Sequence, residues 1–288
     1  MANISLIFLA IQISLFGIII LSALIYSIPI IYFQCFRYHV NIFTLNLCLA
    51  ITGCSLYWII YYTIAEFNSC YLHSENTCML IIYAQMMFTL QVPFAFIILT
   101  VHRYCSIVYH TKHFFKTKQC IAISVIGQWI AAVALSLPMF LNHSLCILSE
   151  WKRIYALIMI VIIPSLIYMI MNGLIVNYVR SSSRRVQPQI KSIQTFSNNT
   201  IRQQSSISRR DVRLLRHMMR MFCIFVGGRS PIYIVLIIAY YIHIDLIVPR
   251  FLSLLADLSL LGDILDLFIY NHELRHFFKN IILTYFRT

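Results

Sequence analysis

Charged residues are scarce in this chain. They make up 11% of its 288 residues, whereas soluble domains contain about 25%. Hydrophobic residues make up 60%, and the mean hydropathy is +0.81. This composition excludes a water-soluble globule. Because about 20 apolar residues cross a bilayer, the length predicts one membrane domain with several spans and leaves no room for a soluble domain.

Patterns typical of enzymes and metal centres are also missing. The nine cysteines contain no C-x-x-C pair and no matching histidine spacing, so they do not predict a metal site. We also find no converging nucleophile, base and orienting residue of the kind that covalent catalysis needs. The sequence therefore predicts neither an enzyme nor a bound metal or cofactor.

Seven charge-poor apolar runs predict seven membrane-spanning helices, and hence an all-α seven-helix bundle. The first run does not resemble a removable signal peptide, because residues 1–36 contain no Lys, Arg, Asp or Glu and the run exceeds the apolar core of such peptides. We therefore expect a retained first helix with a short outer tail. The predicted spans are residues 7–33, 42–65, 79–101, 120–141, 154–179, 217–242 and 250–271.

The basic residues are distributed unevenly between the two sides of these spans. Short cytoplasmic loops collect Lys and Arg, and here one side holds 18 of them, the other side holds 3, and Arg229 lies inside a span. The N-terminus is therefore predicted outside and the C-terminus inside. The net charge of +13 is mostly a topology signal, and we do not expect nucleic-acid binding.

The longest inner loop, residues 180–213, is rich in Ser, Gln and Arg and has almost no apolar periodicity. This composition predicts a flexible cytoplasmic loop. Two interpretations are open. The loop is either a solvated basic linker beside anionic membrane lipids, or a site for kinases and a cytosolic partner.

On the outer side, three cysteines and two asparagines are candidates for covalent modification. Cys70, Cys78 and Cys146 lie where oxidising conditions allow disulfides. Asn3 and Asn142 begin N-x-S/T sequences, which are glycosylation acceptors, and their outer position agrees with the predicted topology.

Several residues match a known receptor pattern in order and spacing. Cys78 precedes the triplet His102-Arg103-Tyr104 by about 38 Å along the predicted third helix, which resembles the third helix of the rhodopsin-like (class A) G-protein-coupled receptors. The resemblance continues with Trp129 and Pro138 in the fourth helix, and with the segment Asp266-Leu267-Phe268-Ile269-Tyr270, similar to the family's (N/D)PxxY. It also implies a cytoplasmic helix and tail over residues 272–288, with the short amphipathic helix near 272–279, and an activation core of Pro93, Pro164, Phe225, Pro231 and Asp266.

The resemblance implies a multi-pass receptor of the plasma membrane. Such a receptor binds an extracellular ligand, either a peptide or a small molecule, and activates a heterotrimeric G protein, with arrestin and kinases as further partners. The resemblance also implies a disulfide between Cys78 and Cys146, and places Arg103 and Tyr270 in G-protein coupling.

Three departures from the family pattern affect the expected mechanism. His102 replaces the usual acid beside Arg103, and we therefore predict that Asp211 holds Arg103 in the off state. Two alternatives are open: Arg103 only anchors its helix at the membrane surface, or Asp211 is a surface acid with no such role. Ile51 replaces the acid of the family's sodium site, so Asp263 and Asp266 either form a relocated cation site or share a proton. Leu267 replaces a proline, which removes an expected break in the last helix.

Arg229 stands where the resemblance places the tryptophan at the pocket floor. An arginine inside a span costs at least about 2.5 kcal/mol, so it should be paired or face water. It either forms an internal bridge to Asp257, Asp263 or Asp266, or anchors a ligand carboxylate or amidated peptide end. By position we expect the ligand pocket to include Gln85, Met86, Thr89, Arg229, Tyr233, Asp257 and Asp263.

The expected ligand is a peptide or a small acid. Gln85 stands where amine receptors have an aspartate, which disfavours an amine, and the last span has no lysine for a retinal Schiff base. Two other functions remain open. One is a seven-helix transporter or channel with an ion or proton path along Arg229 and the intramembrane aspartates, and the other is a receptor-like protein that has lost coupling.

Overall fold

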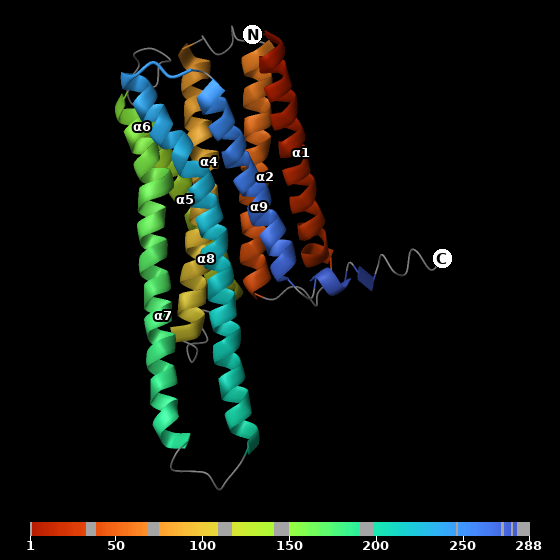
Figure 1. Ribbon diagram of the computed structural model, residues 1–288, viewed down its shortest axis with the longest axis vertical. Helices are drawn as coiled ribbons and strands as arrows, with labels where there is room; N and C mark the ends of the chain where they lie inside the picture. The colour runs from red at the N-terminus through yellow and green to blue at the C-terminus, as the bar shows by residue number, and fades with distance from the viewer. Residues whose placement is uncertain are drawn as a thin grey trace.

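The computed structural model describes residues 2–32, 39–67, 75–108, 117–140, 150–190, 198–245, 247–271, 274–277 and 279–280. Within these ranges the regular structure is helical throughout (Figure 1). The helices are α1 (Ala2–Tyr32), α2 (His39–Phe67), α4 (Glu75–Val108), α5 (Lys118–Ser136), η3 (Leu137–Phe140), α6 (Glu150–Leu157), η4 (Ile158–Ile162), α7 (Ile163–Ile190), α8 (Asn198–Tyr241) and α9 (Ile247–Tyr270).

Each predicted span coincides with one rod of this bundle, because α5 continues into η3, and α6, η4 and α7 form one continuous rod. The first six rods are long and apolar enough to cross a membrane, over Leu6–Tyr32, Asn41–Phe67, Thr77–Cys105, Gln119–Phe140, Glu150–Tyr178 and Arg216–Tyr241. The seventh, α9, has 24 residues, about 36 Å of helix. It differs from the others in carrying three acidic residues, Asp257, Asp263 and Asp266, and all three are buried. The all-α seven-helix prediction is confirmed.

The packing order explains which faces are buried. The central helix α4 contacts α2, α5 and α7, and α9 packs between α1 and α8. The main core gathers buried side chains from these helices, including Phe16, Leu47 and Phe225. Large apolar residues such as Ile130 and Met169 are more than 60% exposed on the outside of the bundle. Such a surface is suited to lipid rather than water.

Each of the third to sixth spans contains a proline near its middle or at an irregular turn. Pro138 lies in the 3-10 turn η3, and Pro164 follows the π-helical turn η4. Both deviations are expected where a proline removes a backbone N–H donor and crowds the preceding turn. Pro93 and Pro231 lie inside α4 and α8, each near the middle of its span.

The structure differs from the sequence prediction between residues 180 and 213. Instead of a loop, α7 continues to Ile190 and α8 begins at Asn198; residues 191–197 lie outside the described ranges. Figure 1 shows the inner ends of α7 and α8 projecting beyond the other helices. The physical reason is that a membrane helix already supplies the nucleus, so each added turn avoids the nucleation cost. Arg and Gln are also good helix formers.

Candidate functional site

A cavity with about 450 Å³ of empty space, which includes the solvent at its open mouth, lies in the outer half of the bundle, between α4, η3, the α6–η4 segment and α8. Four residues predicted for the ligand pocket line it, namely Gln85, Met86, Thr89 and Tyr233. The other lining residues are Ile82, Met139, Arg153, Ala156, Ile160 and Leu236. Arg229, Asp257 and Asp263 are not among them. The cavity is therefore mostly apolar, as ligand sites generally are.

Arg153 is the cavity residue that the sequence analysis missed. Its Nη1 donates to the carbonyl oxygen of Leu236 at 2.6 Å, and its guanidinium carbon lies 5.5 Å from the ring centroid of Tyr240. It therefore connects the outer end of the fifth span to α8. The spacing of Arg153, Ala156 and Ile160 along one helical face was a usable signal, but the residue had been counted only as part of the outer charge.

Arg229 lies below this cavity and is 3% exposed. Its Nη2 is 3.7 Å from the Cys54 sulfur, and its guanidinium lies 5.8 Å from the Phe225 ring. Tyr233 and Asp257 are close enough to interact with it electrostatically. Tyr233, which lines the cavity, thus connects the cavity to the buried arginine.

The predicted Arg–Asp bridge is not formed. Among the described side chains, the ion pairs within 4.0 Å both involve Asp266, and neither includes Arg229. For Asp266 the reason is distance along α8, because Arg229 is twelve residues, about 18 Å, from His217, which binds Asp266. Both carboxylate oxygens of Asp263 and Oδ2 of Asp257 are buried, with no hydrogen-bond partner in the part of the chain that the structure describes. The interior below the cavity therefore contains charges that are near one another but not directly paired.

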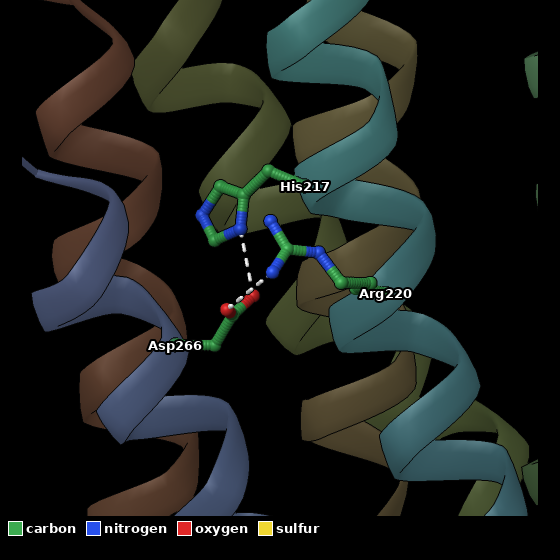
Figure 2. Close-up of polar contacts among 3 residues, drawn as sticks. All are labelled: His217, Arg220 and Asp266. Carbon is green, nitrogen blue, oxygen red and sulfur yellow. Dashed lines mark hydrogen bonds and ion pairs between the residues drawn. The ribbon is translucent and has the colours of Figure 1, made fainter.

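A second polar cluster joins α8 and α9 near the inner ends of the sixth and seventh spans (Figure 2). His217 Nδ1 lies 2.7 Å from Asp266 Oδ2, and their side chains are 3% and 10% exposed. Arg220 Nη1 lies 3.6 Å from Asp266 Oδ1, but its side chain is 58% exposed. The Tyr270 ring stacks on the His217 ring with centroids 3.8 Å apart. Spacings of three on α8 and four on α9 place each pair on one helical face.

The residues predicted for the inner latch lie beside this cluster. Arg103 is 7% exposed and interacts electrostatically with His217, while the His102 ring packs against Phe43 with centroids 4.4 Å apart. The Asp211 side chain lies outside the described residues, so the Arg103–Asp211 pair stays a prediction. The α8–α9 cluster is an additional tie that the sequence analysis did not identify.

A buried network of amides connects α2, α4 and α5. Asn46 Nδ2 donates to Gln128 Oε1 at 2.7 Å, Gln128 Nε2 donates to Gln91 Oε1 at 3.0 Å, and the Trp129 indole donates to Asn46 Oδ1 at 3.3 Å. Trp129 was singled out from the sequence, whereas the two glutamines were not. Such a network fixes the relative rotation of three helices.

The outer covalent features are only partly described. Cys78 is buried at 7% exposure near the start of α4. Cys146, Cys70 and Asn142 lie outside the described residues, and at Asn3 only the backbone is described. The disulfide and both glycosylation sites therefore stay predictions.

The structure is thus that of a polytopic membrane protein. A mostly apolar cavity lies in its outer half, and a charged cluster lies in its inner half. A family model described as "7 transmembrane receptor (rhodopsin family)" matches residues 21–270. The chain belongs to this family of membrane receptors. A search of curated proteins found no match.

Proposed function

We propose that the protein is a plasma-membrane receptor that binds an extracellular ligand in the outer cavity and activates a heterotrimeric G protein. Family membership supports a receptor over the transporter and channel alternatives. The observation that carries the proposal is the double role of α8. Tyr233 and Leu236 on its outer part line the cavity, and His217 on its inner part binds Asp266.

The two sites on α8 are sixteen residues apart, about 24 Å along the helix. A helix transmits a small outer displacement to its inner end, and Pro231 between the two sites is a point where α8 can bend. In the off state, the His217–Asp266 contact holds the inner end of α8 against α9. A ligand that favours the separated arrangement shifts the population toward it.

The free energy of the His217–Asp266 contact is comparable to that needed for coupling between the two sites. Allosteric coupling between two sites is typically about 1–3 kcal/mol, and one buried charged hydrogen bond contributes a comparable amount. Breaking the His217–Asp266 contact therefore suffices to change receptor activity measurably. The exposed Arg220–Asp266 pair contributes less, because water screens it.

The remaining parts of the proposal follow the receptor family. Arg103 contacts the G protein in the on state and Asp211 holds it in the off state. Cys78 and Cys146 form a disulfide over the cavity mouth, and Asn3 and Asn142 carry glycans. Arrestin and kinases act on the inner extensions of α7 and α8, which carry many Ser and Arg residues.

The proposal is tested by nucleotide exchange on heterotrimeric G proteins in membranes that contain the receptor. Wild type, Arg103→Ala and Asp211→Ala are compared at matched surface levels against each of the main Gα classes. The proposal predicts basal exchange that Arg103→Ala abolishes and Asp211→Ala raises. Exchange that equals empty membranes for every variant and every Gα class would contradict it.

A further inference from the structure

The outer cavity has an uneven chemistry. Its aliphatic and sulfur-containing lining comes from Ile82, Met86, Met139, Ala156, Ile160 and Leu236, and its neutral polar groups are Gln85, Thr89 and Tyr233. Among the described residues that line it, Arg153 alone is charged. An occupant that matches this surface has an apolar body and one anionic group.

Arg153 is positioned to hold such an anion. It comes from α6, the first helix of the fifth span at its outer end, and it lines the cavity. The bond to the Leu236 carbonyl and the contact with the Tyr240 ring fix the orientation of the planar group. A fixed guanidinium matches the two oxygens of a carboxylate better than a mobile ammonium does.

The other charged residues of α6 lie outside the cavity lining. Lys152 precedes Arg153 and is 5% exposed, and its Nζ lies 5.8 Å from the centroid of the Trp151 ring. Glu150, the acid in the first turn of α6, accepts a hydrogen bond from the Tyr241 hydroxyl. A cationic ligand would meet the guanidinium of Arg153 and no carboxylate among the described residues that line the cavity, which costs binding energy.

Arg229 does not serve this role, because it is absent from the cavity lining and its guanidinium is turned toward Cys54 and Phe225. A folded or extended peptide is also a poor match. Its backbone amides need many polar partners, and the lining offers Gln85, Thr89 and Tyr233 beside Arg153.

We propose that the outer cavity binds a small amphiphilic carboxylic acid, with its carboxylate on Arg153 and its apolar chain between α4, η4 and α8. The inference rests on the proposed function, since this is the ligand cavity of the proposed receptor. It names Arg153 as the residue that selects an acid over an alcohol or an amine of equal length. Because Arg153 also bonds to Leu236, the bound acid contacts α6 and α8 together.

The test uses the full-length receptor purified into lipid nanodiscs, with a series of straight-chain alkanoates of increasing chain length as probes. Alkanols and alkylamines of the same lengths are the matched compounds, and the readout is the unfolding temperature at increasing probe concentration. A ligand at about one hundred times its Kd raises that temperature by several degrees. We expect one or more alkanoates to do so, with at least about tenfold weaker effects from the matched alkanol and amine.

Two variants at the anion site and one control complete the experiment. Arg153→Gln keeps a donor for the Leu236 carbonyl but removes the charge, and should erase the preference for the acid. Arg153→Lys should keep part of it. Arg250→Gln, on α9 and outside the cavity lining, should leave it intact. Equal stabilisation by acid and alcohol, stronger stabilisation by the amine, no stabilisation by any alkanoate, or a preference that survives Arg153→Gln would each overturn the inference.

This experiment does not measure G-protein activation, so the two proposals fail separately. Acid selectivity that depends on Arg153 without any nucleotide exchange would contradict the receptor function and leave the site standing. Nucleotide exchange without acid selectivity would contradict the proposed acid site and leave the receptor function standing.

Discussion

His217 on α8 and Asp266 on α9 form a buried contact of 2.7 Å at the inner end of the bundle. Each side chain alone would be buried without a partner, which is energetically unfavourable. Together they join two helices whose relative position defines the inner surface. Tyr270, which stacks on His217, extends the contact to the residue that the family pattern links with activation.

Helices α8 and α9 pack closely at Gly228, and this predicts a sharp difference between two adjacent glycines. A Cβ at Gly228 would lie 2.3 Å from the Ser259 Cβ and 3.2 Å from the Leu255 carbonyl oxygen, whereas a Cβ at Gly227 meets nothing within 4 Å. Gly228→Ala should therefore destabilise the receptor by about 1–3 kcal/mol. Gly227→Ala, the control, should be neutral or stabilising by up to about 1 kcal/mol. Thermal unfolding in nanodiscs measures both, and equal effects would contradict the close packing.

The amide network predicts a stability loss at a position with no ligand contact. Gln128→Ala leaves Asn46 and Gln91 without their shared partner, and unsatisfied buried polar groups cost about 1–3 kcal/mol each. Ser124→Ala is a suitable control on the same helix, since its hydroxyl bonds only to the Cys120 carbonyl among the contacts described. The unfolding temperature should fall for Gln128→Ala and change little for Ser124→Ala. The reverse order would show that the network is not structural.

The buried pair Arg229 and Asp257 should be energetically coupled although no salt bridge joins them. Arg229→Met removes a buried charge and leaves Asp257 without its cationic neighbour, so the single variant should be destabilised. The double variant Arg229→Met with Asp257→Asn should recover part of that loss. A double-mutant cycle should give a coupling of at least about 0.5 kcal/mol. Additive effects would show that the two charges act independently.

The family pattern predicts a disulfide between Cys78 and Cys146 at the outer side of the bundle. Peptide mass spectrometry under non-reducing conditions should find Cys78 linked to Cys146, and Cys78→Ala should cost about 2–4 kcal/mol of stability. Cys223→Ala, at an exposed position on α8, is the control and should have little effect. Linkage of Cys78 to Cys70 would contradict the assignment made from the family pattern.

Much of the fold follows from local sequence properties. Apolar runs located all seven rods because lipid exposure demands long stretches of apolar side chains, and the distribution of Lys and Arg predicted their direction. The inner ends of α7 and α8 were missed, because Ser, Gln and Arg fit a solvated helix as well as a loop. Composition does not distinguish the two states once a membrane helix has supplied the nucleus.

The site was predicted less completely, for a geometric reason. Gln85, Met86, Thr89 and Tyr233 share one cavity as expected because they lie on the inward faces of α4 and α8. The contacts between charged side chains of different helices depend on how neighbouring helices are rotated and how far they are shifted along their axes. Both are set by packing over the whole bundle. Asp266 was therefore identified without its partner His217, whose position among many basic residues looked like part of the inner charge.

The most direct test of the account is the basal G-protein activation of His217 and Asp266 variants. Asp266→Asn and His217→Phe each weaken the contact while keeping the side-chain shape, and each should raise basal nucleotide exchange at least about fivefold at matched surface levels. The double variant should go no higher, the exposed Arg220→Gln should change exchange little, and adding Arg103→Ala should abolish it. Basal exchange that stays at the wild-type level in Asp266→Asn and in His217→Phe would contradict an α8–α9 contact that holds the receptor off.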